Sequence, residues 1–105
     1  MIAEDFEITR EKLAKAILFT VKGRVNFNNA AILQYKLEDA LRDGHINIIV
    51  NMSQVEYLNS SGIRVILKTY KHATEAGGSL SIERPSDNVR NVLGLTALDD
   101  MLLKS

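Results

Sequence analysis

The feature that most constrains the fold is a short apolar run, Ile46 to Met52, which lies between two segments of helical periodicity. Its centre, Ile48-Ile49-Val50, is continuous and β-branched, which predicts a strand covered on both faces, as central strands of parallel sheets are. The flanking helical segments are long enough to connect parallel strands by right-handed crossovers. The run therefore predicts an α/β fold with this strand in the middle of the sheet.

The other segments follow in a simple order around this strand. Alternating apolar and polar residues predict strands, and apolar residues at helical spacing predict helices. The expected elements are strands over Phe6 to Thr9 and Ala16 to Val21, a helix over Ala30 to Leu41, the strand Ile46 to Met52, a helix over Ser60 to Ala76, a strand over Ser79 to Glu83 and a helix from Ser86. A polar turn at Arg10-Glu11-Lys12 joins the first two strands as a hairpin. This β-β-α-β-α-β-α order predicts a mixed, mostly parallel sheet of about four to five strands, with the first strand at an edge and helices packed against the sheet.

Composition limits the classes of function. A chain of 105 residues fits one domain spanning 1–105, and 13 Lys and Arg balance 13 Asp and Glu, which argues against nucleic acid as a direct partner. There is no cysteine, so disulfides, thiolate metal sites and cysteine nucleophiles are excluded. The first ten residues do not have the pattern of a signal peptide, and no apolar run is long enough for membrane insertion. A cytoplasmic chain is expected.

Small polar residues mark the start of the second helix, at Leu58-Asn59-Ser60-Ser61-Gly62. A helix start carries unpaired N–H groups and the positive end of the helix dipole, where a phosphate is well held. On local sequence alone the favoured interpretation is an ordinary N-cap. Gly62 shifts the balance, since glycine in an early helical turn costs up to about 1 kcal/mol relative to alanine. Its bare backbone suggests close approach by a partner.

Two further features allow alternative interpretations. The asparagines Asn26, Asn28 and Asn29 offer a cap to the first helix. Phe27 lies among them, and it either packs against that helix as a hydrophobic staple or contacts a partner; the staple is favoured. The inner face of the second helix is predicted to carry Ile63, Ile66, Leu67, Tyr70 and Thr74. Outside that face lie Val65, either packed or in contact with a partner, and a basic stripe of Arg64, Lys68 and Lys71, either solvated or facing an acidic partner.

Nothing in the chain predicts an enzyme. His45 and His72 have neither triad nor metal-ligand spacing and are interpreted as surface histidines. No nucleophile elbow, glycine-rich phosphate loop or metal signature is present in the sequence. No catalytic residue, metal or cofactor is therefore assigned, and the chain is expected to be acted upon.

The segment Val55 to Leu67, preceded by Ile48 to Met52, resembles the signature of the STAS domain family, particularly the bacterial anti-sigma factor antagonists. Gly23-Arg24-Val25-Asn26 is similar to the Gly-x-x-Asp turn of that family, and the order of strands and helices is the same. The resemblance covers nearly the whole chain. It departs from the family pattern at Asn59 and Asn26, where the family usually has Asp.

The resemblance implies a partner switch. Ser60, or as second choice Ser61, would be phosphorylated by an anti-sigma factor that is also a serine kinase with a histidine-kinase-like ATPase fold. Phosphorylation would block binding, and a PP2C-type phosphatase would reset the switch. The residues expected to bind the partner are Asn26, Phe27, Asn59, Ser60, Ser61, Gly62, Arg64, Val65 and Lys68. The alternative is a STAS module that serves as a constitutive structural subunit, for instance of a lipid-transport ABC complex, without control by phosphorylation.

Overall fold

The predicted order of strands and helices is confirmed, with one short helix added at the end. The computed structural model describes residues 5–103; the ends of the predicted domain, 1–4 and 104–105, lie outside the described residues. The elements are β1 (Phe6–Lys12), β2 (Ile17–Val25), α1 (Ala30–Arg42), β3 (Asn47–Leu58), α2 (Ser60–Glu75), β4 (Ser79–Glu83), α3 (Asp87–Leu95) and α4 (Asp99–Leu102).

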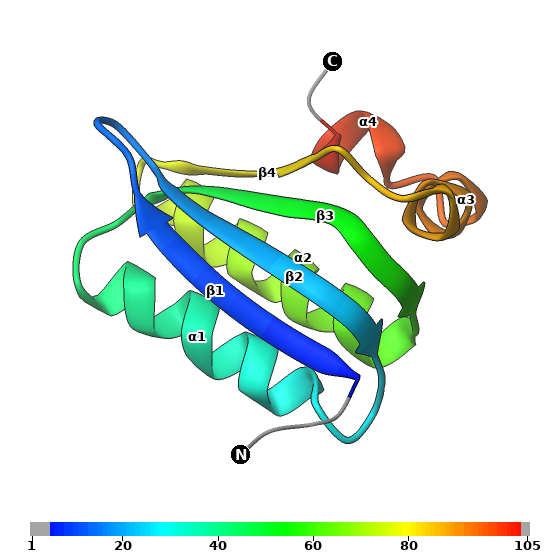
Figure 1. Cartoon of the computed structure of the whole chain (residues 1–105). Coiled ribbons are helices and arrows are strands. Elements are labelled where there is room, and N and C mark those ends of the chain that lie inside the picture. The colour runs from blue at the N-terminus through cyan, green and yellow to red at the C-terminus, as the bar shows by residue number, and fades with distance from the viewer. Residues whose placement is uncertain (1–4, 104–105) are drawn as a thin grey trace.

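The strands form one sheet in the order β1-β2-β3-β4 (Figure 1). Strands β2, β3 and β4 are parallel, and β1 pairs antiparallel with β2 at the edge. Both features follow from the connections, because the helical crossovers join parallel strands whereas a tight turn joins β1 to β2. The prediction that Ile48 to Val50 lies in an interior strand is confirmed.

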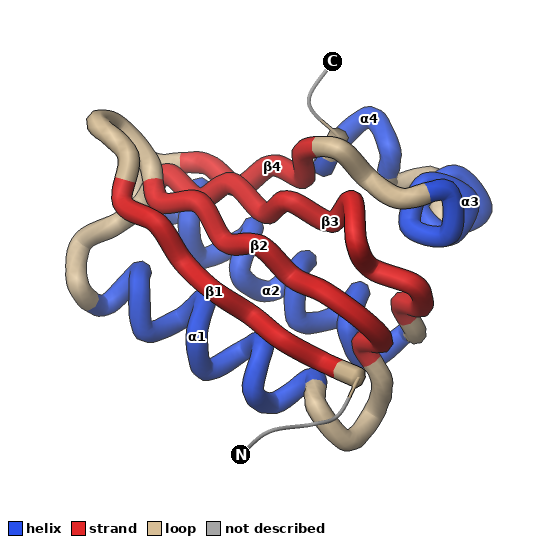
Figure 2. Tube along the Cα trace, in the orientation of Figure 1, coloured by secondary structure: helices blue, strands red, loops and turns tan. Residues whose placement is uncertain are grey.

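Helices α1 and α2 cover one face of the sheet (Figures 1 and 2). Helix α4 packs against β4, whereas α3 packs against the part of β3 that extends past β4, where Ser86 N–H donates to the Met52 carbonyl. Burial along β3 alternates: Ile48 and Val50 are buried and Ile49, between them, is half-buried. The expectation that this strand is covered on both faces was therefore wrong. On the uncovered face Ile49 is in register with the half-buried Leu18 of β2, so apolar neighbours within the sheet account for its apolar character.

Three strands extend beyond their predicted ends, and one of them is β2, which runs to Val25 instead of Val21. The hairpin turn lies at residues 13–16, where Leu13 N–H donates to the Ala16 carbonyl, because the charged residues of the predicted turn belong to the exposed edge strand β1. Strand β3 continues to Leu58 beside β2 after its pairing with β4 has ended at Asn51. Its buried residues Val55 and Leu58 are three positions apart instead of two, because the register of β2 and β3 shifts between them. The alternation that predicts a strand is therefore absent from this part of the sequence.

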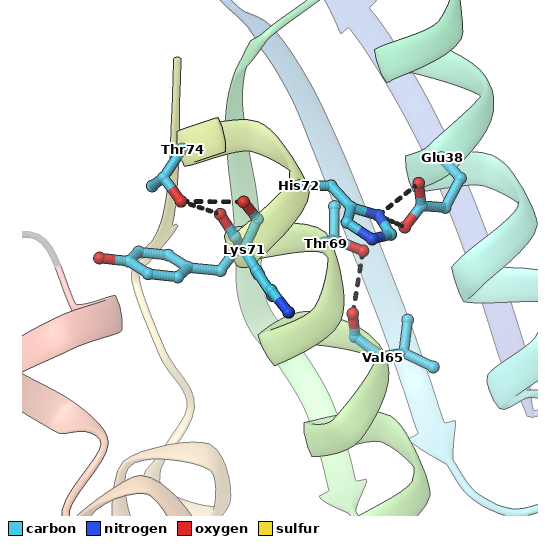
Figure 3. Close-up of polar contacts among 7 residues, drawn as sticks. Glu38, Val65, Thr69, Lys71, His72 and Thr74 are labelled. Atoms are coloured by element: carbon cyan, nitrogen blue, oxygen red, sulfur yellow. Dashed lines mark hydrogen bonds and ion pairs between the residues drawn. The ribbon is translucent and has the colours of Figure 1, made fainter. Parts of the chain in front are cut away.

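The buried face of α2 is rotated relative to the prediction. The residues that it buries are Gly62, Val65, Ile66, Thr69 and Ala73. Of the predicted inner residues, Ile66 is buried, Ile63, Leu67 and Tyr70 are half-buried, and Thr74 is exposed. Small side chains let the helix approach the sheet closely, which leaves the larger ones at the margins of the contact. Thr69 is tolerated there because its hydroxyl donates to the Val65 carbonyl at 2.9 Å (Figure 3).

A hydrogen bond between side chains joins α1 to α2 (Figure 3). His72 Nδ1 lies 2.8 Å from Glu38 Oε2 and 3.0 Å from Oε1. The two side chains are 39% and 19% exposed, so His72 is a half-buried member of the helix contact and not a free surface histidine. This contact helps to fix the relative position of the two helices whose N-termini form the site described next.

Candidate partner-binding site at the helix starts

The two crossover helices on the covered face begin side by side. Val25, the last residue of β2, is in register with Leu58, the last residue of β3. Asn59 N–H then donates to the Val25 carbonyl at 3.1 Å, which ties the start of α2 to the loop that leads into α1. Because parallel strands carry their carboxyl ends to the same edge, loops far apart in sequence meet here, as is usual for sites in α/β folds.

The start of α2 presents a serine hydroxyl to solvent. Asn59 has extended backbone angles, and its Oδ1 accepts a hydrogen bond from Gly62 N–H at 3.2 Å, so the predicted N-cap is confirmed. Ser60 is the first helical residue and is exposed, whereas Ser61 is half-buried. Of the two hydroxyls, that of Ser60 is the more accessible to a modifying enzyme.

Gly62 faces inward. A Cβ atom at this position would lie 2.6 Å from Leu58 Cδ1 and 2.7 Å from Val25 Cγ1, closer than side-chain carbons approach in folded proteins. Its cost in helix propensity is therefore explained by packing against the ends of β2 and β3. The expectation that Gly62 contributes a partner-binding surface is corrected, because the residue is buried.

This packing predicts opposite effects of one substitution at two helical glycines. Gly62→Ala is expected to lower the free energy of unfolding by about 1–2 kcal/mol, since overpacking outweighs the gain in helix propensity. Gly94→Ala in α3 is the matched control: no atom lies within 4 Å of its Cβ position, so the free energy of unfolding should rise, by up to about 1 kcal/mol. Urea denaturation measures both changes. A stabilised Gly62→Ala variant would contradict the packing argument.

Asparagines hold the loop before α1 in place. Asn26 Oδ1 accepts from Asn28 N–H at 2.9 Å and from Asn29 N–H at 3.3 Å, capping the turn that leads into the helix. Asn29, only 3% exposed, accepts from Asn26 N–H at 2.9 Å and donates from Nδ2 to the Arg24 carbonyl at 2.7 Å. The predicted asparagine cap of α1 is therefore wrong: Asn29 occupies the N-cap position but makes no side-chain cap hydrogen bond, and the side chains of Asn26 and Asn29 bind the preceding loop instead.

Phe27 lies in this loop with 80% of its surface exposed. The favoured interpretation of Phe27 as a hydrophobic staple is therefore wrong, because a staple residue packs against the first turns of its helix. An exposed aromatic side chain on a loop held by hydrogen bonds is a typical anchor for protein recognition. The alternative interpretation, a partner contact, is the one that this geometry favours.

The surface around Ser60 is neutral to basic. Neither α1 nor α2 has an acidic residue in its first turn, and Arg64 and Lys68 are exposed on α2. Val65 is 6% exposed and packs in the core, so its assignment to the partner-binding set is corrected. We call the remaining set the Ser60 surface; its members are Asn26, Phe27, Asn59, Ser60, Ser61, Arg64 and Lys68.

One pair of residues at the border of the Ser60 surface was not predicted from the sequence. Arg24 and Tyr57 are cross-strand neighbours at the ends of β2 and β3, and the Arg24 guanidinium carbon lies 4.5 Å from the centre of the Tyr57 ring. Their interaction depends on the register of two strands that are distant in sequence, so no local sequence pattern predicts it. The pair places a third cation, after Arg64 and Lys68, beside the loops that carry Asn26 and Asn59.

Within 5–103, no cluster of three or more His, Asp or Glu side chains is arranged to hold a metal ion. The helices of this part of the chain are also too short or too polar to span a bilayer. The chemical groups of the Ser60 surface are thus two serine hydroxyls, amide and basic groups, and one exposed aromatic ring.

The arrangement of strands, helices and serine-bearing helix start coincides with a known domain. A model of the STAS domain matches residues 7–104. The chain belongs to the STAS domain family. Among the curated relatives of this STAS domain is the anti-sigma-B factor antagonist of Bacillus subtilis (strain 168), which is 27% identical over 86 residues that cover 82% of this chain and 78% of the relative.

Solved structures with this fold include SpoIIAA, an anti-sigma factor antagonist. Its unphosphorylated form has a TM-score of 0.82 at 19% identity, covering 94% of this STAS domain chain and 88% of the other. The phosphorylated form of SpoIIAA, a Bacillus cell fate determinant, has a TM-score of 0.75 at 18% identity, with 94% and 91% covered. At these identities the likeness shows that the fold is shared.

Proposed function

We propose that this STAS domain protein is an anti-sigma factor antagonist in a partner switch. In this proposal the unphosphorylated chain binds, through its Ser60 surface, an anti-sigma factor that is also a serine kinase with a histidine-kinase-like ATPase fold. Binding releases the other client of that kinase. Phosphorylation of Ser60 ends the complex, and a PP2C-type phosphatase restores it. The chain itself is the substrate and catalyses no step.

The observation that carries the proposal is the exposed Ser60 hydroxyl at the start of α2. A kinase needs an accessible acceptor, and Ser60 is exposed where Ser61 is half-buried. A phosphate there adds about −1.5 to −2 charge at the positive end of the helix dipole, so that it can change the surface without unfolding the helix. The names of the curated relatives support the class of function, since they are anti-sigma factor antagonists.

The neutral residues Asn59 and Asn26 are compatible with this role. Both amide oxygens accept the backbone hydrogen bonds that a carboxylate would accept at these positions. The two loops are therefore formed without negative charge next to Ser60. A neutral neighbour also repels an incoming phosphate less than a carboxylate does.

Phosphate mapping in native cells tests the proposal. We expect the intact mass of the purified chain to fall by one phosphate after treatment with a serine phosphatase, and fragment spectra to place that phosphate on Ser60. A Ser60→Ala variant expressed in the same cells should lack the phosphate, whereas Ser61→Ala should retain it. No phosphate under any growth condition would contradict the switch and favour a constitutive structural subunit.

A further inference from the structure

Arg64 is placed to reach the acceptor serine along its own helix. Residues four apart on an α-helix lie on one face, with about 6 Å of axial rise between them. Side chains lean toward the helix N-terminus, so the exposed Arg64 side chain covers the turn that begins at Ser60. Lys68, one turn further on, is about 12 Å from Ser60 along the axis. Arg64 is thus the α2 cation best placed to contact a group on Ser60.

The Arg64 guanidinium is also available to bind an anion. Among the residues that the structure describes, its side chain makes no ion pair or hydrogen bond, whereas Arg42 pairs with Asp39 and Arg24 stacks on Tyr57. The first turn of α2 contains no acidic residue that would compete for it. In the unmodified chain this cation faces solvent, ready to bind an anion.

We infer that Arg64 captures the phosphate of phosphorylated Ser60 within the same chain. The guanidinium offers parallel N–H donors whose spacing matches two phosphate oxygens, and the dipole of α2 favours the same negative charge. This inference rests on the proposed function, in which Ser60 is phosphorylated. It adds a mechanism by which the modification alters the Ser60 surface.

The capture changes two properties of the Ser60 surface together. In the unphosphorylated chain Arg64 and Lys68 present positive charge that suits an acidic patch on the partner. In the phosphorylated chain the Arg64 guanidinium turns back toward Ser60, so the partner loses a cation as well as meeting a new anion. The phosphate therefore acts through a side chain that it does not modify.

The test is a phosphorus NMR titration of the chain with phosphoserine installed at position 60 by genetic encoding. A nearby cation favours the dianion, so it lowers the second pKa of the phosphate. Arg64→Gln is expected to raise that pKa by roughly 0.3–0.7 unit. Lys68→Gln, the matched control, removes the same charge from the next turn and should raise it by much less. Arg64→Lys, a cation without the planar fork, should fall between wild type and Arg64→Gln.

Equal phosphate pKa values in wild type and Arg64→Gln would overturn the capture, as would equal shifts for Arg64→Gln and Lys68→Gln. Arg64 is exposed, so these variants are expected to fold. The experiment needs no kinase or partner. A missing phosphate in native cells would count against the proposed function alone, and an unshifted titration would count against the capture alone.

Discussion

Ser60→Asp is expected to weaken binding of the anti-sigma factor by roughly 30-fold or more, because an unpaired charge enclosed in an interface costs at least about 2 kcal/mol. The charge would stand at an exposed position next to Asn59, within the Ser60 surface. A partner patch that complements Arg64 and Lys68 is acidic, so repulsion adds to desolvation. Titration calorimetry of the purified complex measures the change.

Two variants control this experiment. Ser60→Ala removes the hydroxyl without adding charge and should bind within a few-fold of wild type. Ser53→Asp adds the same charge at an exposed serine of β3 outside the Ser60 surface, and binding should be nearly unchanged. If Ser60→Asp binds as tightly as both controls, charge at Ser60 does not regulate the complex, and the constitutive role becomes the better account.

Phe27→Ala is expected to reduce affinity for the same partner by roughly 30-fold or more. Aromatic residues that enter a pocket at the centre of an interface commonly contribute about 2 kcal/mol or more when truncated. At 80% exposure Phe27 makes little contact within its own chain, so its loss should leave the free energy of unfolding within about 0.5 kcal/mol of wild type. Calorimetry and urea denaturation separate the two effects.

Tyr35→Ala provides the matched aromatic control. Tyr35 lies on α1, the helix that follows the Phe27 loop, and is 62% exposed. It lies outside the Ser60 surface, so its truncation should change affinity by less than about three-fold. Equal losses for Phe27→Ala and Tyr35→Ala would mean that no aromatic anchor is localised in the loop before α1, and would remove Phe27 from the Ser60 surface.

The strand and helix order followed from local patterns because each element has its own periodicity. The apolar run around Ile49 and the alternation in β1 and β2 were sufficient to place three parallel strands and one antiparallel edge. The C-terminal ends of β1, β2 and β3 could not be predicted in this way. Edge strands tolerate charged residues, and the register shifts in the β2–β3 pairing replace the two-residue period by the spacing of Val55 and Leu58.

The residues of the site were harder to predict, because whether a residue is exposed to a partner depends on which parts of the fold pack against it. Asn59 and Ser60 occupy the positions that capping chemistry predicts. Gly62 and Val65 were misassigned because local sequence does not distinguish a small residue that approaches the sheet from one that a partner approaches. Phe27 was misassigned for the opposite reason, since a staple needs a partner side chain that the fold does not place beside it.

The reciprocal hydrogen bonds of Asn26 and Asn29 bear on how quickly a partner can dock. They fix the loop that carries Phe27 during folding, so little conformational entropy remains to be lost when the complex forms. A recognition loop of this kind can associate nearly as a rigid body. The encounter rate is then governed by diffusion and by the long-range attraction of Arg64 and Lys68, which makes it sensitive to ionic strength.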